Sequence, residues 1–135
     1  MNWDTLTSVI ENNRWEQLKR NPATNYRYQY FKANVLKKYA SLKDYMLENK
    51  ISKTHSMCLL PNDFPYDVQN CISHCIAWHV SGEAPSLADY KSFVDKIFDP
   101  AKFDVLIWIN PEHIQSVPDL SHCHVFVKSK FEDYI

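Results

Sequence analysis

Glycine is nearly absent from this chain, and that scarcity restricts its possible folds more than any other feature. The 135 residues contain one glycine, Gly82, and seven prolines. Flexible glycine-rich linkers are therefore excluded, as are the glycine-rich loops that hold phosphate through backbone N–H groups. Any phosphate site must use side chains or helix N-termini.

The composition predicts one domain over residues 1–135. A 45% hydrophobic content with 14% aromatic residues is enough for a core of its own. The four cysteines have three possible pairings, but a chain of this size does not need disulfides, so we expect free thiols. The first ten residues do not have the pattern of a signal peptide, and no apolar run approaches the roughly 20 residues of a membrane span. We therefore expect a cytoplasmic protein.

Residues 1–56 have a mainly helical pattern. Apolar positions recur at helical spacing between Asp4 and Arg20, which fits one broken helix or two short ones. Capping patterns occur at 8–11 and 13–16, and Thr24 is placed to cap a longer helix. Ser41, with Asp44 three residues later, is placed to start another short helix.

Residues 57–135 favour strands and one amphipathic helix. Two prolines in the segment 57–67 require it to be extended or turned. Apolar residues alternate at 74–80 and 122–128, and a continuous apolar run covers 103–109, so each segment favours a strand; the spacing at 71–79 also permits a helix. Ser86 opens a helix that closes before Pro100. We expect an α+β fold, with about three strands, helices packed on one face and an N-terminal helical layer.

Two histidines near the C-terminus are the best candidates for chemistry. His122 and His124 on one strand point to the same face, with Cβ atoms about 7 Å apart. If the neighbouring strand adds His74, three imidazoles can hold a catalytic zinc or another divalent metal. Without metal, imidazoles can act as nucleophile or as general acid and base. The alternative is that they are half-buried residues that only satisfy backbone groups.

Other polar residues are placed to support such a site. Asp63 can fix the tautomer of an imidazole. Short polar side chains follow the apolar run and would lie at the mouth of a pocket beneath His122, although such residues often only form turns. The predicted substrate-binding residues are Asn110, Gln115, Ser116, Tyr66 and Trp78. The cysteines lack the spacing of a second zinc knuckle, and Cys123 points away from its flanking histidines on a regular strand.

Charge is distributed unevenly along the chain. Residues 1–56 carry ten Lys and Arg against five Asp and Glu, and residues 57–135 carry five against eleven, so net charges of +5 and −6 give −1. The segment 26–32 alternates basic and aromatic residues, including Arg27 and Lys32. That composition suits RNA through phosphate contacts and base stacking, but also an ordinary amphipathic helix with solvated lysines.

Two resemblances add to these observations. The order Leu60–Tyr66, His74 with Trp78, Trp108–Pro111, Gln115–Val117 and His122–Phe126 resembles a domain family of unknown function found in fungi, protists and giant DNA viruses. This resemblance covers nearly the whole chain and implies a fold and a set of marked positions, but no activity.

The second resemblance concerns the site alone. Asn110, the run Gln115–Val117 and the His122-x-His124 pair are similar in order to the histidine-triad nucleotide hydrolases and transferases, in which a central histidine forms a nucleotidyl intermediate. The chain departs from that pattern because Phe126 holds the third histidine position, residues 118–121 lengthen the gap, and no glycine follows Asn110. The nucleophile therefore remains undecided between His122 and His124.

Two hypotheses follow. In the first, the chain is a small hydrolase or transferase for a phosphate-containing substrate such as a nucleotide, and uses His122, His124, His74 and Asp63. In the second, it is a binding or regulatory protein that contacts a protein or RNA partner through its basic, Tyr-rich helical half.

Overall fold

A four-stranded antiparallel sheet forms the centre of the protein. The computed structural model describes residues 1–51, 56–80, 83–111, 115 and 120–131. The strands are β1 (Met57–Pro61), β2 (Ser73–His79), β3 (Phe103–Trp108) and β4 (His122–Ser129), in the order β1-β2-β4-β3. The α+β prediction is confirmed, with four strands in place of about three. The additional strand is β1, which lies at an edge of the sheet, where the missing N–H of its proline is tolerated.

The strand register brings the predicted histidines onto one face of the sheet. In the β2–β4 pairing Trp78 lies opposite His122, and His74 lies opposite Phe126. In the β3–β4 pairing Trp108 lies opposite His124. Since side chains alternate between faces along a strand, these six aromatic and imidazole rings share one face. The strand predicted for residues 74–80 is confirmed as β2, which ends at His79.

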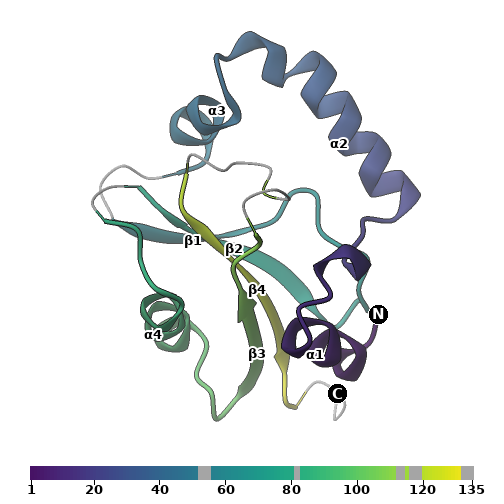
Figure 1. Cartoon of the computed structure of the whole chain (residues 1–135), viewed down its shortest axis with the longest axis vertical. Coiled ribbons are helices and arrows are strands. Elements are labelled where there is room, and N and C mark those ends of the chain that lie inside the picture. The colour runs from purple at the N-terminus through teal and green to yellow at the C-terminus, as the bar shows by residue number, and fades with distance from the viewer. Residues whose placement is uncertain (52–55, 81–82, 112–114, 116–119, 132–135) are drawn as a thin grey trace.

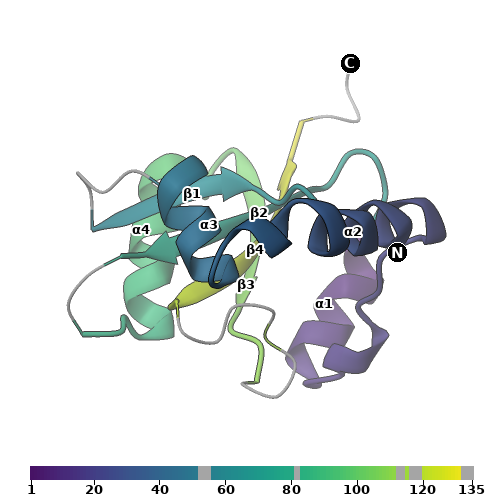
Figure 2. The same cartoon turned by 90° about the horizontal axis from the view of Figure 1, so that it is seen from above.

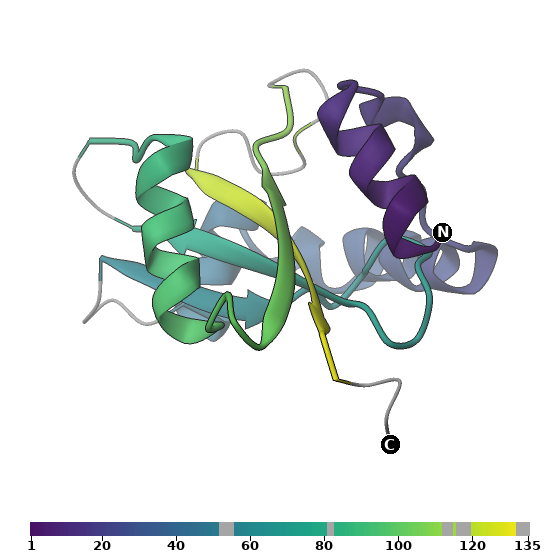
Figure 3. The same ribbon diagram turned by 90° about the horizontal axis from the view of Figure 1, so that it is seen from below.

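Helix α4 (Leu87–Ile97) covers the other face of the sheet (Figure 3). It begins at Ser86, whose side chain accepts the Asp89 N–H while the Asp89 carboxylate accepts the Ser86 N–H, as the capping pattern predicted. Tyr90 and Val94 pack with buried residues of β2 and β4, among them Cys123. The Cys123 thiol therefore lies on the face opposite the histidines.

The N-terminal layer covers the histidine face. It consists of α1 (Trp3–Glu11), η1 (Trp15–Gln17), α2 (Pro22–Asn34), η2 (Leu36–Lys38) and α3 (Leu42–Asn49). Ser41 caps α3 as predicted. The predicted caps of the first helices were wrong: Asn2 caps α1 by accepting from Thr5, and Asn21 caps α2 by accepting from Thr24. Pro22 at the first helical position fixes a helical φ, so α2 begins before Thr24.

Two ends of the histidine face are packed separately. Leu6 and Val9 of α1 join Trp108 and Phe126 in one buried cluster. At the other end, residues around α3 pack with Ile76 and Trp78, and α2 runs between the two ends (Figures 1 and 2). A pocket lies between these two packed ends of the histidine face.

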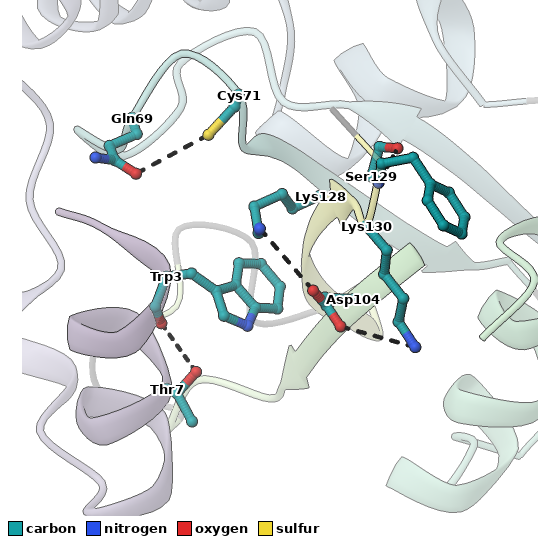
Figure 4. Close-up of polar contacts among 9 residues, drawn as sticks. Trp3, Thr7, Gln69, Cys71, Asp104, Lys128, Ser129 and Lys130 are labelled. Atoms are coloured by element: carbon teal, nitrogen blue, oxygen red, sulfur yellow. Dashed lines mark hydrogen bonds and ion pairs between the residues drawn. The ribbon is translucent and has the colours of Figure 1, made fainter. Parts of the chain in front are cut away.

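Several polar contacts lie outside this region. The Asp104 carboxylate lies 4.0 Å from the ammonium groups of Lys128 and Lys130, across the β3–β4 pair (Figure 4). The Cys71 thiol contacts Gln69 at 3.9 Å. Cys71, Cys75 and Cys123 have free thiols, as predicted for them. Within the described residues, no helix combines the length and apolar character needed to cross a membrane.

Candidate functional site

A pocket of about 330 Å³ lies between the sheet and the N-terminal layer. Its walls are largely aromatic and apolar, and its polar side chains include both histidines of β4. The aromatic walls come from Tyr28, Phe31, Tyr45, Phe64, Tyr66 and Trp78, and the polar side chains from Arg20, Lys50, Asn62, Asp63, Asn110, His122 and His124. Residues predicted from separate parts of the sequence therefore line one cavity.

His74 joins the pair through a direct contact with His124. Its Nε2 lies 2.9 Å from Nδ1 of His124, and the two ring centroids are 5.2 Å apart. The backbone N–H of Tyr66 donates to Nδ1 of His74 at 3.1 Å. A backbone N–H is always a donor, so neutral His74 carries its proton on Nε2 and donates it to His124.

Asn110 contacts the other nitrogen of His124. Its Nδ2 lies 3.1 Å from Nε2 of His124 and donates to the Tyr66 hydroxyl at 3.4 Å. Its Oδ1 accepts the indole N–H of Trp108 at 2.8 Å. Gln115 donates to the Asn110 backbone carbonyl at 2.7 Å, so two of the predicted turn residues support each other beside the histidines.

His122 has a different environment. Its Nδ1 donates to the Leu120 carbonyl at 2.7 Å, and its ring lies 4.9 Å from the Trp78 ring. A carbonyl only accepts, so the neutral ring keeps its lone pair on Nε2. Among the described residues, none makes a hydrogen bond to that nitrogen. His122 is therefore the imidazole with an available lone pair, whereas both nitrogens of His124 have polar neighbours.

Burial keeps these imidazoles neutral. It lowers the pKa of His74 to about 3, with a smaller effect from the positive charge of Arg20. Burial also lowers the pKa of His124 well below its usual value, and His74, His122 and Arg20 act in the same direction. For His122, burial lowers the pKa and the Leu120 carbonyl partly opposes it. At neutral pH all three rings are uncharged.

This neutrality predicts acid sensitivity. Between the unfolded pKa of about 6.5 and the lower folded values, the unfolded chain binds more protons than the folded one. The free energy of unfolding should fall as the pH drops through this window, by up to about 1.4 kcal/mol per pH unit for each such histidine. Urea denaturation at pH 7, 6 and 5 measures it. His124→Gln should show a shallower pH dependence, and an unfolding free energy independent of pH would contradict the buried neutral rings.

Asp63 does not have the role expected for it. Its carboxylate is exposed at the pocket rim and pairs with the Lys50 ammonium at 3.2 Å. The partner that fixes the His74 tautomer is the backbone N–H of Tyr66, and Asn62 lies 3.5 Å from the same nitrogen. Ser116 lies outside the described residues.

His74 and His124 belong to one hydrogen-bonded chain, whereas Nδ1 of His122 is bound to the Leu120 carbonyl. Within the described part of the chain, no group of three or more His, Cys, Asp or Glu side chains is arranged to hold a metal ion. Both nitrogens of His74 face other protein groups, so it has no lone pair for a metal shared with His122.

The sequence patterns did not indicate the roles of Arg20 and Leu120 in this site. The Arg20 Nε donates to the Phe64 carbonyl at 2.7 Å, and its guanidinium lies 4.2 Å from the centre of the Tyr28 ring. That contact spans 44 residues of sequence, so no local pattern could have indicated it. The Leu120 contribution is a backbone carbonyl, which sequence patterns do not identify.

Comparison with known proteins assigns the family but no activity. The profile of DUF3605, a protein family of unknown function, matches residues 2–128. The chain belongs to this family. HTC1, a protein with a crystal structure, shares the fold, with a TM-score of 0.62 and 23% sequence identity. The match covers 97% of this chain and 86% of that one. No curated protein matches this sequence. The predicted resemblance to a domain family of unknown function over nearly the whole chain is thereby confirmed.

Proposed function

We propose that the pocket is the substrate site of a small histidine-dependent hydrolase or transferase, which acts on a phosphate-containing substrate such as a nucleotide. The supporting observation is the state of His122, which lines the pocket: its Nδ1 is held by the Leu120 carbonyl, and among the described residues its Nε2 has no hydrogen-bond partner. A backbone acceptor on one nitrogen orients the ring and raises the basicity of the other.

The pocket chemistry suits a nucleotide. Its volume of about 330 Å³ is enough for a small molecule. Aromatic walls such as Tyr28 and Phe64, which stack at 5.1 Å, offer flat apolar contacts to a planar base. The Arg20 guanidinium and the N–H groups of Asn110 supply charge and donors to phosphate oxygens.

In this proposal His122 is the reacting group. As a nucleophile, Nε2 attacks phosphorus while the P–O bond to the leaving group breaks, and water or an acceptor hydroxyl then takes the phosphoryl group from the histidine. As a general base, Nε2 takes a proton from a water that attacks phosphorus while the same P–O bond breaks. In both cases His124 and Asn110 hold the phosphoryl group. The order of Asn110, Gln115 and the two histidines supports the analogy with histidine-triad enzymes. Phe126, at the third histidine position, is fully buried and serves the core.

A panel of nucleoside phosphates and phosphoesters tests the proposal. Product formation should occur with at least one of them. Intact-protein mass spectrometry distinguishes the two roles of His122, because only the nucleophile gives a covalent adduct. Absence of turnover and of a covalent adduct across the panel would contradict the proposed reaction, whether or not a compound binds.

One observation favours a second candidate, a binding role for α2. Tyr26 and Tyr30 are 71% and 58% exposed on that helix, close in sequence to Arg27 and Lys32. Exposed aromatic and basic side chains are common in surfaces that bind protein or RNA. Crosslinking in cell extract should lose its specific products in the Arg27→Glu/Lys32→Glu variant. Unchanged products would discard α2 as the contact surface.

A further inference from the structure

The hydrogen-bond chain around His124 contains one more proton than it can accommodate. It has a fixed donor at each end, the Tyr66 backbone N–H and the Trp108 indole N–H. From the first end, His74 donates to Nδ1 of His124, so neutral His124 has its proton on Nε2. From the second end, the Asn110 oxygen faces the indole and its NH₂ faces the same Nε2 at 3.1 Å. Two N–H donors therefore face each other.

No alternative assignment of the protons removes this conflict. Turning the Asn110 amide over would satisfy His124 but place the NH₂ against the Trp108 N–H, across a separation of 2.8 Å. Moving the His74 proton to Nδ1 would place it against the Tyr66 N–H, across 3.1 Å. Because each neutral imidazole has one donor and one acceptor, a chain between two fixed donors always keeps one surplus N–H.

The surplus donor can be satisfied only where the chain reaches the pocket. His124 and Asn110 line the pocket, and their side chains are otherwise buried, at 6% and 4% exposure. Tyr66 also lines it, its hydroxyl accepts from Asn110, and no described residue accepts its O–H. Three donors from three pocket-lining residues thus lie within hydrogen-bond distance of one another along the chain.

We propose that His124 Nε2–H, Asn110 Nδ2–H and the Tyr66 hydroxyl form a binding site for an acceptor-only oxygen of an oxyanion, such as a phosphate or carboxylate. The site deepens the proposed function, since it specifies which group of the substrate is held while His122 reacts.

The positive charge of Arg20 also favours an anionic ligand at this site. The positive charge of Arg20 acts on both His74 and His124, and the Arg20 guanidinium lies 5.5 Å from the centre of the Tyr66 ring. An anionic oxygen gains from this charge and from the donors. An ammonium group has only donors and a positive charge, so the site excludes it.

Histidine ¹⁵N NMR of the full chain at pH 7 tests the site. Protons should be found on Nε2 of His74, Nε2 of His124 and Nδ1 of His122. Phenyl phosphate should shift the Nε2 resonance of His124, and benzylammonium, which has the same ring, should not. A proton on Nδ1 of His124, or equal shifts with both compounds, would overturn the proposal.

Trp108→Phe tests the same oxyanion site without changing the net charge. It removes one fixed donor, so the Asn110 amide can turn and accept from His124, which satisfies the chain internally. Phenyl phosphate should bind about tenfold more weakly or worse. Trp15→Phe, the same change against the same core cluster, should retain wild-type affinity. Unchanged binding by Trp108→Phe would overturn the site.

Failure of this site and failure of the proposed reaction are distinguishable. His122→Gln should retain the phenyl phosphate effect on His124, because His122 contributes no donor to the cluster. A wild-type protein that shows this effect but turns over no phosphoester would support the oxyanion site and contradict the proposed enzyme.

Discussion

His122→Gln is expected to reduce turnover of a phosphoester substrate by about a hundredfold to ten-thousandfold, the range for loss of a catalytic acid or base. Glutamine retains the size and a donor for the Leu120 carbonyl, but it has no basic nitrogen in place of Nε2. Substrate affinity should change little, since Arg20, Asn110 and His124 remain. Steady-state kinetics that separate kcat from KM measure the effect.

His79→Gln is the matched control for this variant. His79 ends β2 on the face opposite His74 and Trp78, because side chains alternate along the strand. The control should keep wild-type kcat and KM. Equal activity of His122→Gln and His79→Gln would remove His122 from the reacting role.

Phe126→Ala is expected to destabilise the protein by about 3–5 kcal/mol, the usual range for removal of a buried phenyl ring. Phe126 is 0% exposed, and its ring centre lies 4.8 Å from that of His74 and 4.7 Å from that of Trp108. The truncation leaves a cavity directly behind the hydrogen-bonded chain. Urea denaturation at pH 7 measures the loss in unfolding free energy.

Phe131→Ala provides the comparison on an exposed ring. Phe131 is 55% exposed, just beyond β4, so its truncation should change the unfolding free energy by no more than about 0.5 kcal/mol. If Phe126→Ala were equally mild, the third position of the histidine pattern would not be a core position, and the packing described for the site would be wrong.

Periodicity predicted much of the fold because it reports burial directly. Alternation around His122–Lys128 and the Ser86 capping pattern each depend on neighbouring residues alone. Strand β1 was only predicted to be extended, since its pairing with β2 is a tertiary feature. Thr24 was mistaken for a cap because Asn21 and Thr24 both have capping side chains, and Pro22 decides between them.

The residue types of the site could be predicted from the sequence, but their hydrogen-bond and ion-pair partners could not. Alternation placed His122 and His124 on one face, and the structure adds His74 through the β2–β4 register. The roles of the Tyr66 N–H and the Leu120 carbonyl could not be predicted, because nearly every residue type has the same backbone groups. Asp63 was assigned to an imidazole by its residue type, whereas in the fold it pairs with Lys50.

In the proposed enzyme, His122 and His124 share one substrate pocket. Titration of ¹⁵N-histidine-labelled protein with adenosine monophosphate, and with other nucleoside phosphates as further probes, measures whether one ligand reaches both rings. The His122 and His124 signals should shift together with one Kd, while His79, on the other face of the sheet, should stay unchanged. Signals of His122 and His124 that do not move with any of these nucleotides, or that move with different Kd values, would contradict the shared pocket.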